Sequence, residues 1–102
     1  LIELAELHPH LAVLEAWKKL EGTLIDLSVR KLGSDRKQRV TTHLDALVKA
    51  EILPPQMAKA IRDIREVRNQ AVHELDSPVS KGRAYVLLDT IADIVGFMTR
   101  VN

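Results

Sequence analysis

The chain has 102 residues, of which 46% are hydrophobic and 28% charged, and its formal net charge is +1. This length suits one globular domain, and so small a charge provides no global attraction to nucleic acid or acidic membranes. The sequence contains no cysteine, which excludes disulfides and thiolate chemistry. No apolar run approaches the roughly 20 residues of a membrane span. We therefore expect a single cytoplasmic helical domain over residues 1–102.

The chain begins at Leu1 rather than at a methionine. We therefore expect it to be a fragment of a longer chain. If the preceding part held a membrane span, the domain would lie on the cytoplasmic side of that membrane.

The first helix is expected from about Pro9 to Leu32. Residues 1–7 are a short helical lead-in, interrupted by a proline that suits the first turn of the next helix. Gly33 is the expected stop. Glu21 lies on the apolar face of this helix, whose other members are Val13, Leu14, Trp17, Leu20, Leu24, Leu27 and Ser28.

A polar, basic connection over residues 34–39 leads to a short second helix, expected from about Thr42, a candidate N-cap, to Ala50. The third helix starts at Pro54-Pro55 and runs to about Glu74 or Leu75. It ends there because Asp76-Ser77-Pro78 follows, and a proline disfavours helix at the preceding residue.

The fourth helix is expected from Lys81 to Arg100, with Ser80 as its cap. Its apolar positions recur at helical spacing: Ala84, Leu87, Leu88, Ile91, Ile94, Val95 and Met98. The sequence shows no strand pattern and the connections are short. Together these features predict an all-α protein, an antiparallel four-helix up-down bundle with a short second helix.

An arginine interrupts the apolar stripe of the third helix. At about 100° per residue, Arg68 falls in the middle of a stripe formed by Met57, Ile61, Ile64, Ala71 and Leu75. An unpaired buried charge is very costly, so Arg68 is expected to be paired or functional. Glu21 is its candidate partner. The pair is either a structural ion pair between the first and third helices, or a carboxylate that orients Arg68 toward phosphate.

His73 lies five residues after Arg68 in the sequence, and Asn69 is the residue directly after the arginine. The string Arg68-Asn69-Gln70-Ala71-Val72-His73 resembles the R-x(4–6)-H signature of the HEPN superfamily. These are small all-helical domains, and many are metal-independent ribonucleases, often toxins or antiviral effectors. The phrase RNQAVHEL also resembles HEPN-like domains of unknown function that are appended to restriction or membrane proteins. The resemblance implies a HEPN-like fold over most of the chain.

The resemblance also implies a metal-independent endoribonuclease in which the 2′-hydroxyl of RNA is the nucleophile. His73 would act as general base or acid, Arg68 would stabilise the charge of the transition state, and Asn69 would hold the phosphate or orient His73. The product would be a 2′,3′-cyclic phosphate. No cofactor or metal is expected, because the remaining histidines lack cysteine partners and the regular spacing of a zinc site.

Arg68 and His73 lie about 140° apart on an ideal helix. They would converge if the helix loosens before Pro78, or if two subunits pack together. We therefore expect a homodimer through the third-helix region, as the resemblance implies. Arg62 and Arg65 share the outer ridges with Asn69 and His73. They form either an RNA-backbone patch, extended by Arg36, Lys37 and Arg39, or a solvated face with pairs such as Arg62–Glu66.

A second hypothesis belongs to a different class. The chain would be a non-catalytic HEPN-like module for dimerisation or docking, the soluble tail of a membrane or defence protein. Its partner would be an antitoxin or an upstream domain. The two hypotheses predict different surroundings for the motif: a solvent-open cleft for catalysis, or a sealed arginine with an isolated histidine for a module.

Overall fold

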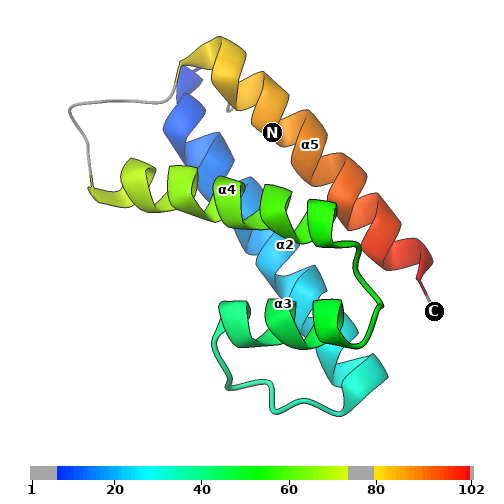
Figure 1. The fold of residues 1–102 in the computed structure, drawn as a ribbon. Coiled ribbons are helices and arrows are strands. Elements are labelled where there is room, and N and C mark those ends of the chain that lie inside the picture. Colours follow the sequence, from blue (N-terminus) through cyan, green and yellow to red (C-terminus); the bar gives the residue numbers. More distant parts are fainter. Residues whose placement is uncertain (1–6, 74–79, 102) are drawn as a thin grey trace.

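The computed structural model describes residues 7–73 and 80–101, with the backbone alone for residues 71–73. Its helices, shown in Figure 1, are α2 (Pro9–Leu32), α3 (Val40–Lys49), α4 (Pro55–His73) and α5 (Lys81–Arg100). The described residues contain no strand. The prediction of an all-α four-helix bundle with a short second helix is confirmed.

Helix α2 has the predicted bounds. Pro9 occupies its first turn, where a missing N–H removes no intrahelical bond. Gly33 follows its last residue with φ 65°, and the Gly33 N–H donates to the carbonyl of Val29 at 3.0 Å. A left-handed residue at this place suits glycine, which has no Cβ to clash.

Helix α3 begins earlier than predicted, at Val40, so the expectation that Thr42 is the N-cap was wrong. The N-cap is Arg39, whose side chain makes no capping bond. Its backbone carbonyl instead accepts from the N–H groups of Thr42 and His43, at 3.0 and 3.1 Å. The helix therefore starts through backbone bonds alone, and the polar side chain that suggested a cap lies inside it.

Helix α4 begins at Pro55, as the proline pair predicted. It extends to His73; the expected breaker at residues 76–78 and the apolar position Leu75 lie outside the described residues. Helix α5 is capped as predicted, because Ser80 Oγ accepts from the backbone N–H of Arg83 at 3.2 Å.

Helix α2 is the centre of the bundle and packs against each of the other three helices. In Figure 1, α2 and α5 begin at the same end of the molecule, while α3 and α4 run antiparallel to each other and cross α2. The second half of α4 extends sideways beyond α2. The buried core comprises Ala16, Trp17, Leu20, Leu24, Leu27, Leu44, Leu47, Leu53, Ala58, Ile61, Ile64, Ile91, Ile94 and Met98.

Within the described part of the chain, no helix combines the length and hydrophobicity that crossing a bilayer requires.

Candidate functional site

Arg68 and Asn69 form a polar pair on α4. Arg68 Nη1 donates to Asn69 Oδ1 at 2.9 Å, and both side chains are half-buried. Val67, directly before them, is the last buried residue among the described side chains of α4. Arg68 thus comes directly after the last buried residue among the described side chains of α4. The buried core of α4 therefore ends before Arg68, and its side chain is only half-buried.

The predicted pairing of Glu21 with Arg68 was wrong. Glu21 Oε2 accepts from the indole Nε1 of Trp17 at 2.9 Å, one turn earlier on the same helix. Ion pairs among the described residues include Lys18–Glu15, Arg36–Asp26 and Arg62–Asp45, and Arg68 belongs to none of them. Arg68 therefore has no ion pair with any described carboxylate, and its positive charge is not neutralised within that part of the chain.

Arg62 makes a contact that the sequence did not predict. Its Nη2 donates to Asp45 Oδ1 of α3 at 2.9 Å, with the two side chains 50% and 68% exposed. The antiparallel packing of α3 on α4 brings this acid within reach, and the expected pair of Arg62 with Glu66 is not formed. Arg65, one turn further along α4, is half-buried.

His73 is the last residue of α4, and its side chain lies outside the described residues. On an ideal helix it shares a side with Arg62, Arg65 and Asn69. The convergence of its imidazole with the guanidinium of Arg68 therefore stays a prediction.

The basic connection contributes less charge than its sequence suggested. Arg36 Nη1 contacts Asp26 Oδ1 at 2.7 Å, so this arginine is paired within its own end of the bundle. Lys37 and Arg39 remain as exposed cations beside the start of α3.

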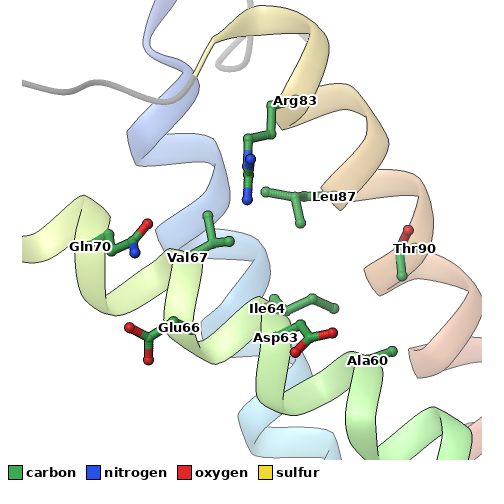
Figure 2. Close-up of a pocket in the computed structure, with 9 residues that line it drawn as sticks. All are labelled: Ala60, Asp63, Ile64, Glu66, Val67, Gln70, Arg83, Leu87 and Thr90. Carbon is green, nitrogen blue, oxygen red and sulfur yellow. The ribbon is translucent and has the colours of Figure 1, made fainter.

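A groove of about 490 Å³ separates α4 from α5. Figure 2 shows the side chain of Arg83 extending from α5 toward Val67, with Asp63 and Glu66 on α4. These two carboxylates make the groove unfavourable for a polyphosphate chain. On an ideal helix Glu66 lies about 40° from Arg62, so the acidic lining of this groove borders the ridge of Arg62, Arg65 and Asn69.

A buried polar network connects α2, the following connection and α3. His43 Nδ1 lies 2.9 Å from Ser28 Oγ, and Ser28 Oγ donates to Ser34 Oγ at 2.8 Å. The imidazole tautomer decides whether Nδ1 donates to Ser28 Oγ or accepts from it. His43 Nε2, the other ring nitrogen, is buried and has no hydrogen-bond partner among the described residues.

Sequence reasoning considered His43 only as a metal ligand and missed this network. Two signals were present: Ser28 lies on the apolar face of α2, and His43 shares the apolar edge of α3 with Leu44 and Leu47. Two polar side chains that face one core must satisfy each other. No group of three or more potential metal ligands occurs within residues 7–73 and 80–101.

The family model of the domain of unknown function DUF4145 matches the chain over residues 8–101. Comparison with curated proteins and with solved structures finds no match. Because the family model spans nearly the whole chain, from just before α2 to just after α5, the chain belongs to the DUF4145 family.

Proposed function

We propose that this domain is a HEPN-like, metal-independent endoribonuclease that cleaves RNA through Arg68, Asn69 and His73. One observation supports the proposal above the others. The guanidinium of Arg68 is half-buried, held by Asn69, and paired with no described carboxylate. A cation kept in this state is suited to a phosphate group, which it can bind with two parallel hydrogen bonds.

The chemistry requires two proton transfers. A general base removes the proton of the 2′-hydroxyl, the 2′-oxygen bonds to phosphorus, and the bond from phosphorus to the 5′-oxygen breaks. A general acid then protonates the departing 5′-oxygen. His73 is proposed to serve one of these steps. Arg68 stabilises the charge that develops on the phosphate oxygens, and Asn69 keeps the guanidinium in position.

The RNA backbone is proposed to follow the outer ridge of α4. Arg65 lies one helical turn before Asn69 on that ridge, and Lys37 and Arg39 are exposed at the adjoining start of α3. The groove between α4 and α5 is a less favourable path, because two carboxylates, Asp63 and Glu66, line it with one cation, Arg83. By the HEPN resemblance, the activity belongs to a cytoplasmic toxin or phage-defence system, regulated by an antitoxin or an upstream domain.

The test is RNA cleavage with a chelator present. Wild type and His73→Ala are incubated with a panel of labelled RNAs, and circular dichroism checks that both are folded. His10→Ala serves as the matched control because it removes a histidine from the start of α2, outside the proposed site. We expect cleavage by wild type and by His10→Ala, and none by His73→Ala. Equal cleavage by wild type and His73→Ala would exclude the proposed role of His73.

The alternative is a non-catalytic module for dimerisation or docking. It is favoured by a separate observation on α5, where apolar side chains at regular spacing are half-buried or exposed.

A further inference from the structure

Helix α5 carries a second regular stripe beside the face that packs into the core. Its members are half-buried or exposed and follow one another at steps of three and four residues: Tyr85, Leu88, Ala92, Val95 and Thr99. This is the spacing of a coiled-coil seam. The hydroxyl of Thr99 donates to the carbonyl of Val95 at 2.7 Å, so it needs no other partner.

This stripe forms one wall of a groove of about 410 Å³ between α2 and α5. The residues that line this groove include Ala16 and Lys19 on α2, and Leu88, Asp89, Ala92 and Val95 on α5. The base of the groove is apolar, and its side chains near the middle are small alanines. A helix can therefore approach closely here.

The two rims of the groove carry opposite charges. Lys19 lies on the α2 rim and Asp89 on the α5 rim, both exposed. Neither forms an ion pair with any residue that the structure describes. A surface that combines an apolar base with one unpaired cation and one unpaired anion is complementary to itself.

We propose that this groove is the contact surface for a second copy of the chain, with the two α5 helices side by side and parallel. The two-fold axis runs between the two α5 helices and parallel to them. Each residue of α5 then lies level with the same residue of the second copy, and opposite flanks of the two helices face each other. Lys19 then meets Asp89 of the second copy, because both residues line the same groove from opposite rims. An antiparallel pair would place like flanks together, with Asp89 facing the acidic flank of its mate.

This arrangement differs from the interface that the sequence predicted through the third-helix region. The α5 residues that face α4, namely Leu87 and Thr90, lie on the opposite side of α5 from Ala92. Each copy therefore keeps its own α4, with the Arg68–Asn69 pair, away from the contact. The inference stands whether or not the domain cleaves RNA, and it gives the docking alternative a specific partner.

A charge exchange tests the contact. Analytical ultracentrifugation would measure the dimer dissociation constant of wild type, Lys19→Glu, Asp89→Lys and the double variant. Each single substitution places like charges together, so we expect the constant to rise about tenfold. The double variant restores opposite charges and should return toward the wild-type value. Lys59→Glu, with the same charge change at an exposed site on α4, should dimerise like wild type.

Cysteine cross-linking tests the direction of the helices. The chain has no cysteine of its own, so Ala92→Cys and Thr99→Cys each introduce one thiol. In a parallel pair both positions lie against their own copies, and both variants should form disulfide dimers under mild oxidation. In an antiparallel pair centred on Ala92, the two Thr99 positions would be about 21 Å apart. Asp63→Cys, in the groove between α4 and α5, is the control and should form no disulfide-linked dimer.

Three outcomes would overturn the proposal. The first is a wild-type chain that stays monomeric up to its solubility limit. The second is a double charge variant that dimerises no better than the single variants. The third is cross-linking through Ala92→Cys without cross-linking through Thr99→Cys. None of these outcomes depends on RNA cleavage, so a failure of the ribonuclease proposal would be seen separately.

Discussion

Arg68 donates a hydrogen bond to the side chain of its own neighbour, Asn69, at 2.9 Å. Adjacent residues on a helix point about 100° apart, so this contact requires the long arginine to bend round toward the amide. The amide therefore fixes one conformation of a side chain that otherwise has many. A guanidinium held in this way is prepared for an oxyanion.

Asn69 can be tested by changing its charge rather than its size. Asn69→Asp would place a carboxylate at the same oxygen and turn the contact with Arg68 into an ion pair. We expect little change in the free energy of unfolding and a loss of RNA cleavage, because the guanidinium would be neutralised. A purely structural role predicts the reverse: Asn69→Asp would keep the function, and only Asn69→Ala would lose it. Urea denaturation and an RNA cleavage assay on both variants distinguish the two roles.

Arg68→Lys tests whether a positive charge at this position is sufficient for RNA cleavage. Lysine keeps the positive charge but lacks the planar fork that binds two phosphate oxygens. We expect Arg68→Lys and Arg68→Ala both to lower the cleavage rate by about 100- to 1,000-fold, as for the loss of an oxyanion donor. Their free energy of unfolding should fall by about 1 kcal/mol or less, because Arg68 lies outside the sealed core. Full activity in Arg68→Lys would show that the fork is not used.

Most of the fold could be predicted from the sequence because helix breakers and periodicity agree. Pro9 and Gly33 delimit α2, and Ser80 caps α5, each for a local reason that acts through neighbouring backbone groups. The start of α3 could not be predicted in the same way. The N-cap of that helix is Arg39, which acts through its backbone carbonyl alone, whereas the sequence had suggested the side chain of Thr42 as the cap.

The buried histidine of α3 should contribute to stability. His43→Ala removes a hydrogen-bond partner of Ser28 and leaves a cavity at a position that is 0% exposed. We expect the free energy of unfolding to fall by about 1–3 kcal/mol, the typical cost of an unsatisfied buried polar group. His10→Ala, at the start of α2, should change it by less than about 0.5 kcal/mol. Equal stability of His43→Ala and wild type in chemical denaturation would show that the network carries little energy.

The ion pair between Arg62 and Asp45 should matter much less. Both side chains are at least half exposed, and exposed pairs contribute about 0.2–1 kcal/mol. A double-mutant cycle with Arg62→Ala and Asp45→Ala should give a coupling energy in that range, and the coupling should decrease as salt is added. A coupling above about 2 kcal/mol, or one that salt leaves unchanged, would contradict an exposed pair.

The candidate site was harder to predict than the fold, because its partners come from contacts that helix periodicity does not describe. Helical periodicity placed Arg68 and Glu21 each on the apolar face of its helix and so suggested an ion pair between them. It could not show that Trp17, one turn before Glu21, would take the carboxylate, or that the core would end at Val67. The pairing of Arg62 with Asp45 likewise depends on how α3 lies across α4.

The most direct test of the central claim uses the 2′-hydroxyl itself. Wild type is given an RNA oligonucleotide and the same oligonucleotide with a 2′-deoxy nucleotide at the cleavage position, both with excess chelator. We predict that the RNA is cut to a 2′,3′-cyclic phosphate and a 5′-hydroxyl, and that the 2′-deoxy substrate stays intact. Cleavage of the 2′-deoxy substrate, or no cleavage of any RNA by the folded wild-type chain, would contradict the assignment of Arg68, Asn69 and His73 as a ribonuclease site.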